Sequence, residues 1–394
     1  MATTQYLSYT MKQPKILLLV VIALLPLTLV SCISGSAQLA KGWSGTAVHD
    51  GIIYVGTVDG RVVAINSSTE NLEWSYSIAP GTAPSSGLSC GQTSAPTAIY
   101  DTPIVDRDIV YIGTYNGQVY ALSIADGEDM WVYPRTGSIG AIVGSPVVAN
   151  ETIYISSSDG NIYALATSNG KREWYTDSPL ADKLWTSPTV MGDTLYVSTF
   201  DGHIYALSLE TGELLDWSFE SEAGFISSPV IDEDTIFLGS FDRHLYAVKI
   251  GSDLPMWKFP EEKPAGNWFW ASPIVNEGIV YTGCLDSKLY AIEAQTGEKL
   301  WEFDAGNPIV SSPVLMDNLL IVTDESGTVY VFDLSTELGD EAMPLKTISI
   351  GAAVRSSFCA QEGLVYIRGE DNQLYVMDIE KGEVSWKVPL SIEE

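Results

Sequence analysis

The 394-residue sequence predicts an all-β protein, an eight-bladed β-propeller whose blades are four-stranded antiparallel sheets. Three observations lead to this prediction. A pattern of about forty residues recurs eight times, half of the copies contain an Asp-Gly or Asn-Gly dipeptide between apolar stretches, and most copies end on a tryptophan. Such dipeptides mark tight hairpins, and four short strands per repeat of this length are typical of a propeller blade.

Each copy is aligned on an aromatic or aliphatic strand residue. The eight anchors are Tyr54, Tyr111, Tyr154, Tyr196, Phe237, Tyr281, Ile321 and Tyr366. The position eight residues before each anchor, called here the proline position, is a proline in six copies and follows a small residue in all of them. Because proline donates no backbone hydrogen bond, the first strand is expected to be innermost, with its edge facing an axial channel.

A tryptophan closes seven of the eight copies and is expected to form a buried structural column. These residues are Trp74, Trp131, Trp174, Trp217, Trp257, Trp301 and Trp386. The seventh copy lacks the tryptophan and runs through VFDLSTELGDEAMPLKTI instead. Because a single blade cannot bury both of its faces, the eight copies are expected to close into one ring, a single domain over residues 42–394.

The N-terminal residues predict a targeting signal. Lys12 and Lys15 precede an apolar run that reaches Val30, which is typical of a secretory signal and short for a membrane span. The run ends in LVSC and resembles a bacterial lipobox, so residues 1–31 are expected to be a signal peptide, Cys32 the lipid attachment site and residues 32–41 a tether. An ordinary signal peptide with an incidental cysteine and an uncleaved anchor are the alternatives, and Met11 is a possible native start.

The charge balance is strongly acidic, with 20 Lys and Arg against 50 Asp and Glu and a formal net charge of −30. Such a surface repels phosphate backbones, which argues against a nucleic-acid partner. It also gains nothing from anionic lipid, so durable membrane attachment would depend on the acyl chains at Cys32.

The segment AIEAQTGEKLW, residues 291–301, resembles the pyrroloquinoline-quinone-type propeller repeat with its tryptophan-docking motif. This resemblance covers the chain from Gly42 to Leu390. Together with the lipobox, it is similar to the BamB-like lipoproteins of outer-membrane barrel assembly. The resemblance implies a quinoprotein-dehydrogenase-like fold and a non-catalytic scaffold, lipid-anchored in the cell envelope, which binds protein partners there as a monomer within a complex.

The same repeat also occurs in quinone-dependent dehydrogenases, and that resemblance implies a quinone held between a tryptophan and an adjacent Cys-Cys disulfide, with bound Ca²⁺. This chain contains no Cys-Cys pair, and Cys90, Cys284 and Cys359 leave an odd thiol after Cys32. We therefore expect no cofactor, no metal site and no catalytic residues. Of the histidines, His203 and His244 are expected to be solvated turn residues. A quinone-binding redox protein and a small-ligand or polysaccharide receptor remain the alternatives.

The candidate partner-binding residues lie three positions before the proline position, where the chain enters the inner strand near one mouth of the channel. They are Trp43, Tyr100, Trp185 and Trp270, with Trp268 and Phe269 beside the last of these and Arg355 in the eighth copy. Trp, Tyr and Arg are enriched in binding hot spots. Aliphatic residues fill the same column in the third, fifth and seventh copies, which favours inter-blade packing as the alternative role.

Overall fold

The computed structural model describes residues 42–78, 97–181, 183–336, 338–339 and 342–391. The chain divides into two compact units, residues 1–38 and residues 39–394. The first unit lies outside the described residues, and so do the expected signal peptide, Cys32 and Cys90. Within the described ranges, no helix is long and apolar enough to cross a membrane.

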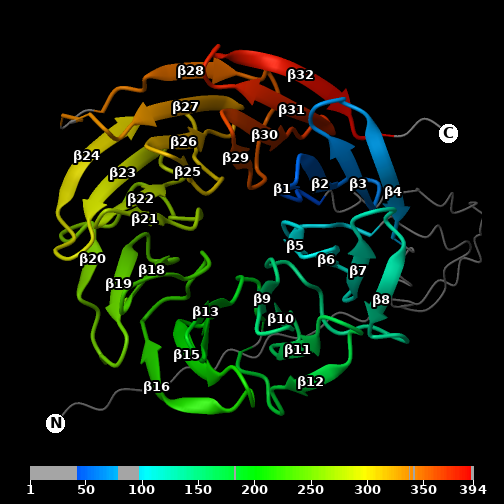
Figure 1. Cartoon of the computed structure of the whole chain (residues 1–394). Coiled ribbons are helices and arrows are strands. Elements are labelled where there is room, and N and C mark those ends of the chain that lie inside the picture. Colours follow the sequence, from blue (N-terminus) through cyan, green and yellow to red (C-terminus); the bar gives the residue numbers. More distant parts are fainter. Residues whose placement is uncertain (1–41, 79–96, 182, 337, 340–341, 392–394) are drawn as a thin grey trace, which may run out of the picture. The chain divides into compact units, whose positions relative to one another are not determined.

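The second unit is a ring of eight four-stranded antiparallel sheets, which confirms the predicted all-β propeller (Figure 1). The first four blades contain β1 (Thr46–His49), β2 (Ile52–Gly56), β3 (Arg61–Asn66), β4 (Leu72–Ser77); β5 (Ile104–Asp106), β6 (Ile109–Gly113), β7 (Val119–Ser123), β8 (Asp129–Tyr133); β9 (Val147–Ala149), β10 (Thr152–Ser156), β11 (Ile162–Ala166), β12 (Arg172–Tyr175); β13 (Thr189–Met191), β14 (Thr194–Ser198), β15 (His203–Ser208) and β16 (Leu214–Glu220). The last four contain β17 (Val230–Asp232), β18 (Thr235–Gly239), β19 (Leu245–Lys249), β20 (Trp257–Phe259); β21 (Ile274–Asn276), β22 (Ile279–Gly283), β23 (Lys288–Glu293), β24 (Lys299–Asp304); β25 (Val314–Met316), β26 (Leu319–Thr323), β27 (Thr328–Asp333), β28 (Lys346–Ser349); β29 (Cys359–Gln361), β30 (Leu364–Arg368), β31 (Gln373–Asp378) and β32 (Glu383–Pro389).

Each blade is one continuous segment whose strands pair in chain order, and this includes the first and last blades. The ring closes by packing: β29 and β30 contact β1. Buried residues of the first blade, such as Ile53 and Val63, share a core cluster with Tyr366 and Val376 of the last blade. Among the described residues, the hydrophobic faces of blades one and eight meet directly, and the four strands of each blade come from one segment of the chain.

The inner strands β1, β5, β9 and their equivalents lie around the axis (Figure 1). The prolines stand immediately before these strands and not within them, as Pro103 before β5 shows. In five of the six copies with a proline, the small residue before it is a serine whose hydroxyl accepts a hydrogen bond from the preceding blade. The backbone N–H groups of Thr102, Ser145, Ser187, Ser228 and Ser272 donate to Oγ of Ser145, Ser187, Ser228, Ser272 and Ser312 at 2.8–3.1 Å.

The tryptophan column joins each blade to the next one. Trp131 is 6% exposed, and its Nε1 donates to the carbonyl oxygen of Thr167 at 2.8 Å. Its ring lies against Gly170, where φ is +65° and a Cβ atom would stand 2.4 Å from the ring. Trp74, Trp257 and Trp301 are also buried. Trp174, Trp217 and Trp386 are only half-buried, although each still packs against a core cluster between blades, so the expectation of burial is wrong for these three.

The seventh copy replaces the tryptophan with a lysine that makes similar contacts. Lys346 pairs with Val331, as Trp301 pairs with Ala291 in the sixth blade. Its Nζ donates to the carbonyl oxygen of Glu380, and its side chain lies beside Gly382. The aliphatic stem thus covers the glycine turn of the next blade while the ammonium group takes over the hydrogen bond.

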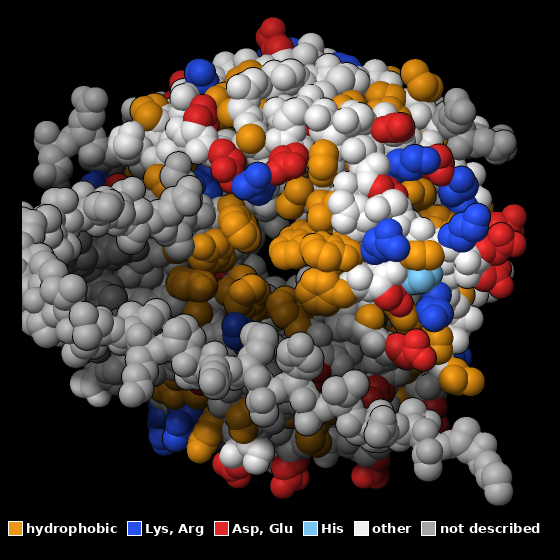
Figure 2. Space-filling model, turned by 180° about the vertical axis from the view of Figure 1, so that it is seen from behind, with side chains coloured by type: hydrophobic (Ala, Val, Ile, Leu, Met, Phe, Trp, Pro, Cys, Tyr) orange, Lys and Arg blue, Asp and Glu red, His pale blue; other side chains and the backbone are white. Residues whose placement is uncertain are grey.

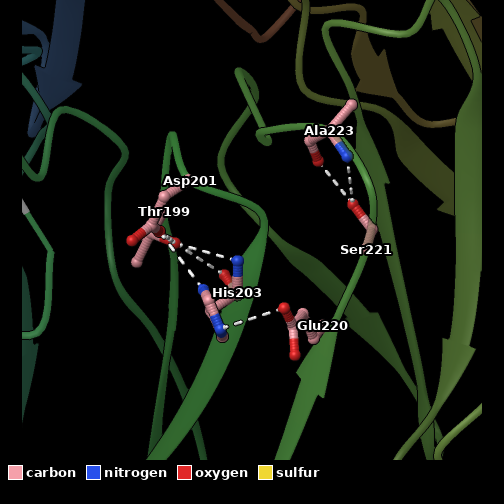
Figure 3. A network of polar contacts seen from close by, with 6 residues as sticks. All are labelled: Thr199, Asp201, His203, Glu220, Ser221 and Ala223. Atoms are coloured by element: carbon pink, nitrogen blue, oxygen red, sulfur yellow. Dashed lines mark hydrogen bonds and ion pairs between the residues drawn. The ribbon is translucent and has the colours of Figure 1, made fainter.

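The second hairpin of each blade is stabilised by its own side chains. In the fourth blade, the backbone N–H of His203 donates to Oγ1 of Thr199 at 2.9 Å (Figure 3). Nδ1 of the His203 ring lies 3.4 Å from Oδ1 of Asp201. The side chain of His203 is 26% exposed and that of His244 is 14% exposed. Both histidines therefore lie beside the aspartate of their own turn, as expected of turn residues, but they are half-buried and not fully solvated.

Candidate functional site at the channel mouth

A cavity of about 290 Å³ lies where the chain enters the inner strands. The eight residues located three positions before the proline position all line it. They are Trp43, Tyr100, Val143, Trp185, Ile226, Trp270, Val310 and Arg355. Figure 2 shows hydrophobic side chains gathered around a central opening. The repeat therefore places one column of side chains around one mouth.

Two chains of aromatic contacts begin at this cavity: Trp43, Tyr100, Tyr115, Trp185 and Phe200 line it, whereas Phe241 and Trp268 extend the second chain beyond its lining. In the first, the ring of Tyr100 lies 4.7 Å from that of Trp43 and 5.2 Å from that of Tyr115. The second runs from Trp185 through Phe200 and Phe241 to Trp268, with successive ring centroids separated by 5.5, 5.3 and 5.4 Å. All five contacts are edge-to-face, a favoured geometry for aromatic pairs. The rings therefore support one another and present a fixed surface.

Sequence reasoning missed Tyr115, Phe200 and Phe241. All three occupy the same place in their copies, directly after the small residue that follows the second strand: Thr-Tyr-Asn-Gly, Thr-Phe-Asp-Gly and Ser-Phe-Asp-Arg. The available signal was that this turn position carries an aromatic residue in three copies, although the turn itself does not require one.

Phe269 is a correction to the predicted set. Its side chain is 0% exposed and packs against Phe259 and Tyr290 in the core between two blades. Successive side chains of an extended segment point to opposite sides, so Phe269 faces inward while its neighbours face outward. Trp268 is 38% exposed. Trp268 and Trp270 remain candidate binding residues, whereas Phe269 is a core residue.

Arg355 is an exposed cation on the wall of the cavity. Its Nε and Nη2 atoms lie 2.7 and 2.6 Å from Oε1 of Glu325. The hydrogen bond to this carboxylate raises the pKa of Arg355 above its usual value. On the other side of the mouth, Nζ of Lys183 lies 5.4 Å from the centre of the Trp185 ring.

Asp101, next to Tyr100, is a buried carboxyl group with one unsatisfied oxygen. Its Oδ2 accepts the backbone N–H of Gly113 at 2.6 Å, while Oδ1 has no partner. Burial raises the pKa of Asp101 to about 8. Five of the other seven copies carry serine or threonine at this position, and Ser44 and Ser227 accept the equivalent glycine N–H there, so the role of Asp101 is structural.

The residues of the mouth do not fit a quinone held between a tryptophan and a disulfide. Cys284 and Cys359 are free and belong to different blades. Burial raises the pKa of Cys359 to about 11, and it also raises the pKa of the fully buried Cys284. Over the described ranges, no group of three or more His, Cys, Asp or Glu residues is placed to hold a metal ion. We therefore derive no chemistry through a cofactor here.

The fold and the mouth together define a propeller of the type that serves both scaffolds and quinone enzymes. A family model described as outer membrane protein assembly factor BamB matches residues 33–259 and 250–339. The chain therefore belongs to the BamB family.

Comparisons with individual proteins show the same fold. A BamB from Legionella pneumophila (strain Paris) is 33% identical over 94 residues, which is 24% of this chain and 23% of that relative. The crystal structure of BamB from Moraxella catarrhalis is 17% identical with a TM-score of 0.63, covering 84% of this chain and 92% of that one. A quinohemoprotein alcohol dehydrogenase from Comamonas testosteroni is 14% identical with a TM-score of 0.61, covering 86% of this chain and 71% of that one.

Proposed function

We propose that this protein is a non-catalytic, membrane-anchored scaffold that binds a protein partner during outer-membrane protein assembly. The observation that carries the proposal is the aromatic mouth, present in a chain of the BamB family. The Legionella and Moraxella relatives are named as BamB, the former as an outer membrane protein assembly factor. The aromatic mouth supplies the surface on which such a partner would dock.

The geometry of the mouth suits protein binding. Tyr115 and Trp268 are 43% and 38% exposed, yet each is held edge-to-face against another ring. An aromatic side chain that is already ordered loses little conformational entropy when a partner covers it. Large aromatic residues of this kind dominate the energetics of many interfaces.

The membrane anchorage in this proposal rests on the sequence of the N-terminal residues. Cleavage before Cys32 and lipidation of its thiol would attach the propeller to a membrane of the cell envelope. Replacing Cys32 with alanine should move the protein from the membrane fraction to the soluble fraction or leave the signal uncleaved. An unchanged, processed protein in the membrane fraction would contradict lipid anchoring.

Partner capture tests the scaffold role. The double variant Tyr115→Ala, Trp268→Ala removes one exposed ring that lines the cavity and one at the end of the neighbouring aromatic chain. Tyr175→Ala, which removes a ring on β12 that is also 38% exposed, is the matched control. We expect the double variant to retain less than about a tenth of an outer-membrane assembly component that co-purifies from solubilised membranes. The control should retain it fully. Equal capture by both variants would contradict docking at the mouth.

A small-ligand or polysaccharide receptor is the second candidate, because an aromatic cavity lined with serine hydroxyls also suits a sugar ring. In that case Trp268→Ala and Trp270→Ala would abolish oligosaccharide-dependent quenching of tryptophan fluorescence while partner capture stayed unchanged.

A further inference from the structure

The inner wall of the mouth presents a set of hydrogen-bond donors. Ser145, Ser187, Ser228, Ser272 and Ser312 each accept a backbone N–H at Oγ and line the cavity. Across the described part of the chain, none of these five hydroxyls has an acceptor for its own hydrogen. A hydroxyl has one hydrogen and two lone pairs, so each serine that accepts on the wall side still has its hydrogen to donate.

Trp185 adds another donor to the same wall. Its Nε1 atom is buried and has no hydrogen-bond partner in the described structure, although the residue lines the cavity. Leaving a buried N–H unpaired costs about 1–3 kcal/mol. Because the atom itself is buried, an acceptor on a ligand would pair with it only after the Trp185 ring shifts, and would then recover part of that cost.

Arg355 supplies the charge that such an acceptor would meet. Its two contacts with Glu325 both end on a single oxygen, Oε1, and use the Nε and Nη2 atoms. A guanidinium group has five N–H donors, so the edge formed by Nη1 and Nη2 remains available for a second carboxylate. The side chain of Arg355 is 49% exposed, whereas that of Glu325, at 31%, is the less exposed of the pair. Glu325 therefore acts as a positioning residue that orients the guanidinium group.

We propose that the channel mouth binds a carboxylate of an acidic peptide segment, held by Arg355 and the serine hydroxyls, while the flanking apolar side chains pack on the aromatic rim. The proposal rests on the proposed scaffold function and specifies the chemistry of its partner. Each of the five serine hydroxyls keeps a hydrogen to donate, and the charged residue among those that line the cavity is Arg355. An acceptor with negative charge is the complement of both features.

The acidity of the whole chain does not prevent this recognition. At physiological ionic strength the Debye length is about 8 Å, so most of the net charge of −30 is screened from a ligand in the mouth. Within hydrogen-bond reach, the ligand meets the guanidinium group, the hydroxyls and the carboxylate of Glu325, which already occupies Nε and one N–H of Nη2. Distant acidic residues slow its approach but do not change the contacts that it makes.

A matched pair of peptides tests the proposal. Acetyl-Phe-Asp-Phe-amide and acetyl-Phe-Asn-Phe-amide differ only in the charge of the central side chain, and binding to the intact propeller is followed by tryptophan fluorescence and calorimetry. We expect the aspartate peptide to bind at least about tenfold more tightly, since hydrogen bonds to charged groups are the stronger ones. This preference should diminish as salt is added.

Two arginine variants locate the effect. Arg355→Gln should abolish the preference for the aspartate peptide. Arg107→Gln should retain it, because Arg107 is likewise paired with a glutamate, Glu151, but follows the first strand of its blade, away from the mouth. A preference that survives Arg355→Gln, or equal binding of the two peptides, would overturn the proposal. If neither peptide binds at millimolar concentration while the partner is still captured, the carboxylate proposal fails and the scaffold function stands.

Discussion

Replacing Trp131 with alanine tests how the blades are held together. The ring is 6% exposed, lies against Gly170 and donates a hydrogen bond of 2.8 Å to the carbonyl of Thr167. Truncating a buried tryptophan to alanine typically costs about 3–5 kcal/mol of unfolding free energy. The carbonyl of Thr167 keeps a second donor, the hydroxyl of Tyr111 at 3.4 Å, so the lost hydrogen bond adds little beyond the cavity. We therefore expect a loss of about 3–5 kcal/mol, a large share of the ~5–15 kcal/mol that stabilises typical proteins.

The assay is urea unfolding followed by circular dichroism, with two comparison variants. Gly170→Ala keeps the Trp131 ring but adds a methyl group that would press against it, at a residue whose φ is positive. Both effects should destabilise the protein, by at least about 1 kcal/mol in total. Trp268→Ala removes an exposed ring and should cost less than about 1 kcal/mol. An unchanged midpoint for Trp131→Ala would refute the idea that this column holds the ring together.

Three further changes probe other parts of the ring. Burial raises the pKa of Asp101 to about 8, so the folded protein keeps this carboxyl protonated where the unfolded chain would lose the proton. The unfolding free energy should therefore fall as the pH rises toward 8. Asp101→Asn should remove this fall and make the urea midpoint less dependent on pH between about pH 5 and about pH 8. Ser228→Ala removes the acceptor for the N–H of Ser187 and should lower the unfolding free energy by about 1–3 kcal/mol, read from the same curves. Lys346→Ala should lower the urea midpoint, whereas Lys346→Trp should leave it at the value of the unchanged protein or raise it. Equal midpoints for the two variants would contradict a tryptophan-like role for this lysine.

Much of the fold could be predicted because its determinants are local and repeated. An Asp-Gly turn such as Asp59-Gly60 specifies its hairpin within a few residues. Eight equivalent copies can bury both faces of every blade by closing into a ring, and the structure is such a ring. The same equivalence identified the column from Trp43 to Arg355, since residues at one repeat position must lie at one level of the ring.

The remaining features depend on contacts between copies, which a repeat alignment does not contain. The orientation of Phe269 follows from how its segment crosses into the next blade, and so its inward position was missed. The role of the serines emerged only once the N–H of one blade was seen to meet the hydroxyl of its neighbour, as in Ser145 and Ser187. Lys346 escaped notice because the longer segment before it hides its alignment with the tryptophans.

Site-specific photo-crosslinking in cells tests the central claim, docking of a protein partner at the channel mouth, most directly. A photoreactive phenylalanine analogue at Tyr115 or Phe200, which both line the cavity, would face the mouth, and the same analogue at Tyr175 would report on the outermost strand of the third blade. We predict one discrete adduct from the two mouth positions, identified by mass spectrometry as an outer-membrane assembly component, and none from Tyr175. Adducts from Tyr175 alone, or no adduct from either mouth position in a folded, membrane-bound protein, would contradict the claim.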